Sequence, residues 1–139
     1  AKKMLKNIPF QTAKVIVELG PGTGIFTEKI LKKLHPDTHL VVIELNDVFY
    51  RNLVKKINQE NCHIVHGSAG DLGKILSELG FEKADCVVSS LPLSNFPKEL
   101  RVSIMQAVLH CLTQVGTFIQ FQYTLQSKKH FKSLFKKKT

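Results

Sequence analysis

Apolar residues fall along the chain in two alternating patterns. Five short, nearly continuous apolar runs rich in branched residues predict buried strands, and longer runs with apolar positions three or four residues apart predict helices between them. The predicted strands are VIVEL (15–19), HLVVIE (39–44), CHIV (62–65), ADCVVSS (84–90) and TFIQFQYT (117–124), the last opened by Gly116. Strands separated by helical crossovers indicate an α/β fold, with a parallel sheet covered by helices on both faces.

The helical runs have recognisable starts and ends. One helix begins at Gly24 and ends at HPD (35–37), and the next is capped by Asn46 or Asp47. A short helix ends near Leu79, a longer one covers about 98–112, and a basic amphipathic helix begins near Ser127. The residues expected on buried stripes of the first, second and fourth of these helices are Ile25, Phe26, Ile30, Leu31 and Leu34, then Val48, Phe49, Leu53, Val54 and Ile57, then Leu100, Ile104, Ala107, Val108 and Cys111.

Composition narrows the functional classes. The chain has 139 residues, enough for a single globular domain, and no apolar run long enough for a membrane span or a secretory signal, so we expect a cytoplasmic protein. Three scattered cysteines are expected to be small buried side chains, and no cluster indicates a metal site. The net charge of +9, with six lysines and no acid in KKHFKSLFKKKT (128–139), favours a nucleic acid or an anionic membrane as partner, or marks a solvated helix end.

The segment VELGPGTG (17–24) carries the first candidate chemistry. Glycines at 20, 22 and 24 follow a strand and open a helix, so backbone N–H groups and the positive helix end point toward a ligand. The loop lacks the GK[ST] ending of a P-loop and the GxGxxG spacing of dinucleotide folds. Glu18 would repel a pyrophosphate and attract a cation. S-adenosylmethionine fits, because its amino-acid end has both an ammonium and a carboxylate; alternatively, Glu18 is an exposed acid at a strand end.

Glu44 is a second candidate acid. It ends the second predicted strand, twenty residues after Gly24, where a carboxylate can accept both hydroxyls of an adenosine ribose. This position predicts an adenosyl cofactor without identifying which one. Together with Glu18 and the glycines, it favours S-adenosylmethionine.

These motifs resemble a known family. VELGPGTG followed by VVIELN is similar to the first two motifs of class I S-adenosylmethionine-dependent methyltransferases, and the resemblance covers nearly the whole chain. Within that class, ELGPGTGIFTEKIL, VVSSLPLSNFP and GTFIQFQYT most resemble bacterial phospholipid N-methyltransferases, which methylate phosphatidylethanolamine. Ribosomal RNA adenine dimethyltransferases are the next most similar. The resemblance implies a Rossmann-like, doubly wound sheet with five parallel strands present and the terminal antiparallel strands missing.

The resemblance also implies which residues hold the cofactor. The first motif would bind the methionine portion, Glu44 the ribose, and the third motif the adenine. The residues implied are Glu18, Leu19, Gly20, Pro21, Gly22, Thr23, Gly24, Glu44, Leu45, Ser68, Ala69 and Ser89. The third motif departs from the family, because HGSAGDL has Ser68 where an acid is expected. Either Ser68 or Asp71 would then contact the adenine.

The fourth predicted strand ends in SSLPLSNFP (89–97), where the acceptor is expected. Adenine methyltransferases have a polar residue followed by two residues and an aromatic here, which hold a flipped base. This chain has Ser90, Leu91, Pro92 and Leu93, so the asparagine and the aromatic are both absent. An apolar loop with a serine favours a lipid acceptor, and an ordinary proline turn is the alternative. Tyr123 is the candidate for lining the acceptor pocket, or it packs at the strand end.

Three functions therefore remain open from the sequence. The first is N-methylation of a phospholipid headgroup such as phosphatidylethanolamine, with the protein peripheral on the inner face of the membrane. The second is N6-methylation of adenine in ribosomal RNA, and the third is a cofactor-binding module without activity. The chain is expected to be one methyltransferase domain (1–139), either trimmed at both ends or part of a longer protein. Its oligomeric state is not indicated.

Overall fold

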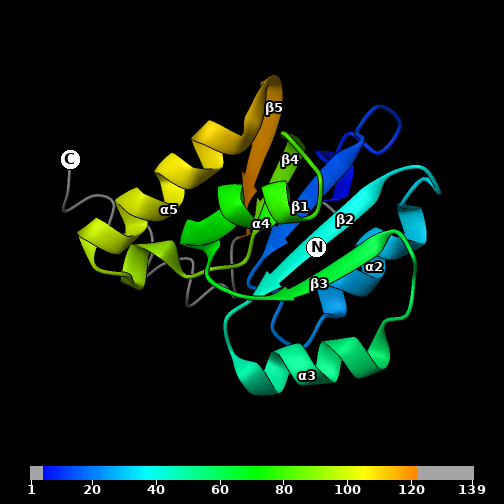
Figure 1. Ribbon diagram of the computed structural model, residues 1–139, viewed down its shortest axis with the longest axis horizontal. Coiled ribbons are helices and arrows are strands. Elements are labelled where there is room, and N and C mark those ends of the chain that lie inside the picture. The colour runs from blue at the N-terminus through cyan, green and yellow to red at the C-terminus, as the bar shows by residue number, and fades with distance from the viewer. Residues whose placement is uncertain (1–4, 122–139) are drawn as a thin grey trace.

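Five strands form one parallel sheet in the order β3-β2-β1-β4-β5 (Figure 1). The computed structural model describes residues 5–121. Its strands are β1 (Val15–Leu19), β2 (His39–Glu44), β3 (Cys62–His66), β4 (Ala84–Ser89) and β5 (Leu112–Gln120). The predicted bounds of β1 and β2 are confirmed to the residue. The predicted α/β fold with five parallel strands is confirmed as well.

Helices cover both faces of the sheet, so the fold is doubly wound (Figure 1). Helices α2 (Ile25–Lys33) and α3 (Asp47–Lys56) contribute side chains to the core on one face. Helices α4 (Leu72–Glu78) and α5 (Lys98–Cys111) pack on the other face, where the short turns η1 (Ala69–Asp71) and η2 (Leu93–Asn95) also lie.

The strand order places a topological switch point between β1 and β4. The chain runs from β1 outward through β2 to β3, and then returns to lay β4 against the other side of β1. In open parallel sheets, ligands bind outside the carboxyl ends of the strands at this point. The segments that follow β1, β2 and β4 are therefore the ones that can form a site.

The alternation of side chains along β1 decides which core each residue joins. Val15, Val17 and Leu19 face α4 and α5, whereas Ile16 faces α2 and α3. By the same alternation Glu18 faces α2 and α3. The acid of the first motif thus lies under a helix, within an otherwise apolar layer.

The fifth strand begins earlier than the sequence predicts. It starts at Leu112 and includes Gly116, whereas the prediction placed its first residue after that glycine. The pairing with β4 shifts between Ala84, which is opposite Leu112, and Cys86, which is opposite Thr117. This irregularity accommodates the extra residues of β5, which is the usual effect of a bulge. Residues 122–124 of the predicted strand lie outside the described residues.

Part of the predicted buried stripes is wrong. In α3 only Leu53 is buried, whereas Val48 is 57% exposed and Val54 is also exposed. Helical residues rotate by about 100° each, so Val48 and Val54 cannot share the contact that Leu53 makes with the sheet. Ile25 and Leu100 are exposed as well. The predicted helix beginning near Ser127 lies outside the described residues.

Candidate functional site

The glycine loop between β1 and α2 has a backbone that few other residues could adopt. Gly20, Gly22 and Gly24 have φ values of 68°, 60° and 87°, in the left-handed region that favours glycine. A Cβ at Gly20 would lie 2.6 Å from Leu91 Cδ2, and one at Gly24 would lie 2.5 Å from Leu53 Cδ2. A Cβ at Gly22 would meet nothing within 4 Å. The loop is therefore packed on two sides and open at Gly22, where a ligand could approach its backbone.

Glu44 connects the end of β2 to this loop. Its Oε1 accepts from the Gly22 N–H and its Oε2 from the Asn46 N–H, both at 2.9 Å. A carboxylate has about four lone-pair sites, so each oxygen can accept a further hydrogen bond. Glu44, which is predicted to receive the ribose hydroxyls, therefore lies beside Gly22. Its hydrogen bonds with two backbone N–H groups leave lone pairs available for a ligand.

Glu18 is completely buried, so the alternative of an exposed acid at a strand end is wrong. The Thr27 hydroxyl of α2 donates to Oε1, while Oε2 is buried with no hydrogen-bond partner among the described residues. The pKa of Glu18 is raised from 4.5 to about 7, mainly because the carboxyl is buried; the hydrogen bond from Thr27 opposes this shift, and the charge of Glu44 adds to it. Thr27 was not singled out from the sequence, although a hydroxyl at a buried position of α2 was the available signal.

The charges around these two acids leave room for a cation. Among residues 5–121, the ion pairs involve other acids, and neither Glu18 nor Glu44 takes part in one. A buried carboxylate oxygen without a donor is unfavourable, and a cationic ligand would relieve it. The acceptor oxygens of Glu18 and Glu44 thus fit a ligand that has an ammonium group and a ribose.

The predicted adenine contacts lie at the same edge of the sheet. Gly67 N donates to the backbone carbonyl of Glu44 at 3.1 Å, which brings the segment after β3 beside β2. Ser68 Oγ accepts from Gly70 N at 3.3 Å, and Asp71 is exposed. Leu45 is exposed beside Glu44, where it could cover a flat ring. Contact of any of these residues, or of Ala69, with an adenine stays a prediction.

The loop after β4 packs directly on the glycine loop. Ser90 N donates to Leu19 O at 2.9 Å, and Leu91 N donates to the buried Ser89 Oγ at 3.2 Å. With the Leu91 side chain against Gly20, the predicted acceptor segment and the predicted cofactor segment are in contact. Leu93, in the position of the missing aromatic, is only 7% exposed. Tyr123 lies outside the described residues.

Gln120 was missed by the sequence analysis and belongs to this edge. It is the last residue of β5, opposite Ser89, and its Nε2 donates to Leu91 O at 2.7 Å. Its Oε1 is buried without a partner among the described residues. The available signal was an amide side chain between the apolar residues Ile119 and Phe121.

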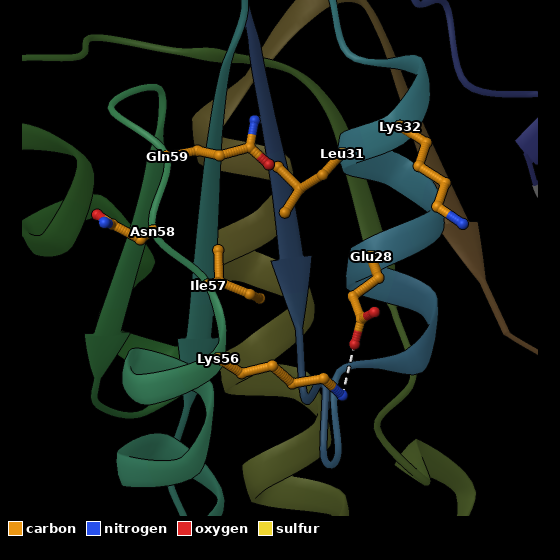
Figure 2. Close-up of a pocket in the computed structure, with 7 residues that line it drawn as sticks. All are labelled: Glu28, Leu31, Lys32, Lys56, Ile57, Asn58 and Gln59. Atoms are coloured by element: carbon orange, nitrogen blue, oxygen red, sulfur yellow. Dashed lines mark ion pairs between the residues drawn. The ribbon is translucent and has the colours of Figure 1, made fainter.

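A pocket of about 440 Å³ lies between α2 and the end of α3 (Figure 2). None of the residues predicted to hold the cofactor lines it. Its lining residues are Glu28, Leu31, Lys32, Lys56, Ile57, Asn58 and Gln59. Lys56 forms an ion pair with Glu28 and donates to Thr23 O at 3.3 Å. This lysine therefore ties the end of α3 to the glycine loop.

Two further properties of residues 5–121 bear on function. No three histidine, cysteine or acidic side chains in this part of the chain come together so as to hold a metal ion. No helix within it combines the length and the apolar character needed to cross a bilayer. The three cysteines are free thiols: Cys86 and Cys111 are buried and Cys62 is half-buried.

Comparison with known proteins shows a match to one family and to two kinds of methyltransferase. The model of the family described as ribosomal RNA adenine dimethylase matches residues 1–76. The chain is 41% identical over 121 residues to an ornithine lipid N-methyltransferase from Singulisphaera acidiphila, covering 86% of this chain and 63% of that protein. It is 25% identical over 141 residues to the ribosomal RNA small subunit methyltransferase A of Borreliella burgdorferi, covering 94% and 49%.

Solved structures show the same fold. The crystal structure of an S-adenosylmethionine-dependent methyltransferase from Mesorhizobium loti superposes with a TM-score of 0.66 at 17% identity, covering 86% of this chain and 51% of that one. This likeness confirms the predicted Rossmann-like fold of the class I methyltransferase type. The chain spans about half to two thirds of the length of these relatives.

Proposed function

The chain belongs to the ribosomal RNA adenine dimethylase family, which indicates a methyltransferase, and we propose that it transfers a methyl group from S-adenosylmethionine to the amine of a lipid headgroup and not to an RNA base. The family match covers residues 1–76, which include the glycine loop, Glu18 and Glu44. It therefore supports the cofactor. The choice of acceptor depends on the remainder of the chain.

The cofactor assignment follows from the donors and acceptors at the carboxyl edge. Glu44 would accept the ribose hydroxyls, since its oxygens keep lone pairs beyond those used by Gly22 and Asn46. Glu18 Oε2 would accept from the ammonium of the methionine portion, and the N-terminus of α2 would favour its carboxylate. When bound, the sulfonium supplies an activated methyl group, so the protein mainly has to hold a nitrogen lone pair in line with it.

The observation that carries the lipid acceptor is Leu93. An adenine acceptor needs an aromatic platform at this position, and here a leucine is folded into the core on the α5 face. Ser90 likewise replaces the asparagine that would accept from the base. The 41% identity over 121 residues to an ornithine lipid N-methyltransferase, against 25% over 141 residues to the Borreliella burgdorferi enzyme, supports the same choice.

Among lipids we propose phosphatidylethanolamine as the substrate, with ornithine lipid sharing the relevant chemistry. Both are amphiphiles with a primary amine, whose ammonium form has a pKa of about 10 and must lose a proton before it can attack. The net charge of +9 supports binding at an anionic membrane surface, which for a cytoplasmic protein is the inner face of the membrane.

Methylation of ribosomal RNA adenine is the second candidate. The family description and the Borreliella burgdorferi relative favour it, and the positive charge suits RNA phosphates equally well. An inactive cofactor-binding module is the third, favoured by Ser68 in place of the acid of the third motif.

One experiment separates these functions. The protein is incubated with methyl-labelled S-adenosylmethionine and, in parallel, vesicles with phosphatidylethanolamine, vesicles with ornithine lipid, and ribosomal RNA. We expect label in a lipid amine and none in RNA, and the Glu44→Ala variant should lose this transfer. Label in RNA alone would replace the lipid proposal by the second candidate. Cofactor binding by calorimetry without transfer to any acceptor would favour the third.

A further inference from the structure

The orientation of the Gln120 side chain is determined by its neighbours. Its Nε2 lies 2.7 Å from Leu91 O and 3.4 Å from Phe121 O, and both partners are carbonyl oxygens that can only accept. Exchanging the two ends of the amide would place Oε1 against the Leu91 carbonyl. The nitrogen therefore faces the loop after β4, and the oxygen faces elsewhere.

The Gln120 oxygen is an acceptor for which the described residues supply no donor. Oε1 is buried and has no hydrogen-bond partner among residues 5–121. Buried polar atoms of this kind are rare, because a missing hydrogen bond is not compensated by water. This oxygen lies at the carboxyl end of β5, at the same edge of the sheet as the glycine loop. A ligand that donates a hydrogen bond to it would supply the missing partner.

The position of Gln120 indicates which ligand would donate this hydrogen bond. Leu91, whose carbonyl Gln120 holds, packs on Gly20 of the glycine loop, and Gln120 itself is opposite Ser89 in the sheet. The loop held by Gln120 is the one that would receive the methyl acceptor. We propose that Gln120 orients the acceptor: Oε1 accepts an N–H of the amine to be methylated, while Nε2 holds the Leu91 carbonyl in place. This proposal rests on the proposed function.

A neutral amide suits this task better than a carboxylate. A carboxylate beside the amine would stabilise the ammonium form, which has no lone pair to attack with. An amide oxygen can accept an N–H from the neutral amine and turn its lone pair toward the methyl group without that penalty. Because Oε1 is buried in this structure, the groups that cover it must move aside when the acceptor amine enters.

The same strand contains a matched control. Thr113 Oγ1, near the other end of β5, is also buried without a partner among the described residues. Its neighbour Leu112 is opposite Ala84, the first residue of β4, so this hydroxyl is at the edge of the sheet away from the glycine loop. Thr113→Val removes an unmet acceptor of β5 without touching the proposed site.

The test compares Gln120→Met, Gln120→Glu and Thr113→Val with the wild-type chain. Methyl transfer to phosphatidylethanolamine and to ornithine lipid in mixed micelles gives kcat and KM for the acceptor. Calorimetry with S-adenosylmethionine gives the cofactor Kd, and thermal unfolding gives Tm. We expect Gln120→Met to lower kcat/KM for the lipid by about 10- to 100-fold, with cofactor Kd within about twofold of wild type. Tm should fall slightly, because Met cannot donate to Leu91 O.

The remaining variants sharpen this test. In Gln120→Glu, burial favours the neutral acid, whose O–H can replace Nε2 toward Leu91, so we expect it to keep more activity than Gln120→Met. Thr113→Val should leave kcat, KM and Kd unchanged. Wild-type acceptor kinetics in Gln120→Met, or equal losses in Gln120→Met and Thr113→Val, would overturn the role of Gln120 alone. A wild-type chain that transfers no methyl to either lipid would overturn the proposed function and this role with it.

Discussion

Residues 15–46 and residues 89–121 meet at the same edge of the sheet, but they are held there by different contacts. The first segment is held by backbone geometry and a carboxylate. Its three glycines have a left-handed backbone conformation, and Glu44 accepts hydrogen bonds from the N–H groups of Gly22 and Asn46. The second relies on apolar packing and on neutral side chains, with Leu91 against Gly20 and held by Gln120.

The first segment contains the features shared by the family, and the second contains the residues expected to select the substrate. The family match covers the first segment and stops at residue 76, before the second begins. An adenosyl cofactor needs charged and backbone partners at fixed positions, and these produce a sequence motif of glycines and acids. A lipid amine needs an apolar loop with few polar atoms, and such a loop has no distinctive sequence motif. The cofactor and the acceptor can therefore be tested independently, on opposite sides of the contact between Leu91 and Gly20.

The largest expected effect is on the carboxylate of the first segment. Glu44→Ala removes the acceptor for the Gly22 and Asn46 N–H groups and, by the proposed function, for both ribose hydroxyls. We expect the affinity for S-adenosylmethionine to fall by about 100- to 1,000-fold, measured by calorimetry. Glu44→Gln, which keeps one acceptor oxygen, should show a smaller loss. Wild-type affinity in Glu44→Ala would mean that the first segment does not hold the ribose.

Glu18 should give a pH-dependent effect of somewhat smaller size. Its pKa is about 7 in the folded chain, above the ordinary value of 4.5, so the folded state binds the proton more tightly than the unfolded state. The carboxyl therefore destabilises the fold progressively as the pH rises from about 4.5 to about 7, by up to about 3 kcal/mol. Glu18→Gln should match wild type at pH 4.5 and be more stable at pH 8.

Urea unfolding at the two pH values measures this difference for Glu18. The control is Glu28→Gln, because Glu28 is a half-exposed carboxylate on α2, paired with Lys56, and its replacement should change stability by less than about 1 kcal/mol. We also expect Glu18→Gln to weaken cofactor binding above pH 7, where the wild-type acid is ionised. A variant with equal stability gains at both pH values would show that burial does not govern Glu18.

Replacing the glycines tests the contact between the two segments. Gly20→Ala and Gly22→Ala both place a Cβ on a left-handed backbone, which costs about 1 kcal/mol. At Gly20 the Cβ also overlaps Leu91, so we expect a total loss of about 2–3 kcal/mol there. Urea unfolding measures both losses. In the double variant Gly20→Ala/Leu91→Ala the overlap is relieved, and strict additivity of the two single losses would argue against the contact.

The smallest effect is expected at the opposite edge, which serves as a control for both segments. His63 Nε2 on β3 lies 2.9 Å from His39 Nδ1 on β2. Burial lowers the pKa of His63, and the charge of His39 lowers it further. The unfolded chain therefore binds more protons at this site, and stability is lost as the pH falls below about 6.5. His63→Gln should reduce this loss in unfolding experiments at pH 5 and pH 7.5. A change in cofactor affinity would contradict the separation of the two edges.

Local patterns were sufficient for most of the fold. Branched apolar runs ended by glycine or an acid placed β1 and β2 to the residue, and the capping side chain of Asn46 marked the start of α3, where it accepts from Phe49 N. Gly116 misled the prediction of β5, because an irregular pairing with β4 lets the strand continue through it. Strand ends depend on a partner strand, which the local pattern does not contain.

The order of the elements, the glycine loop and the two acids follow from local patterns in the amino-acid chain, since strand propensity, glycine conformation and carboxylate chemistry all act within a few residues. Three features arise only when the chain is folded: Thr27 donates to the buried Glu18, Glu44 accepts from Gly22 N–H, and Gln120 donates to Leu91 O across 29 positions of the chain. Hydrogen bonds and burial between distant residues follow from how the strands are brought side by side, and no local preference specifies them.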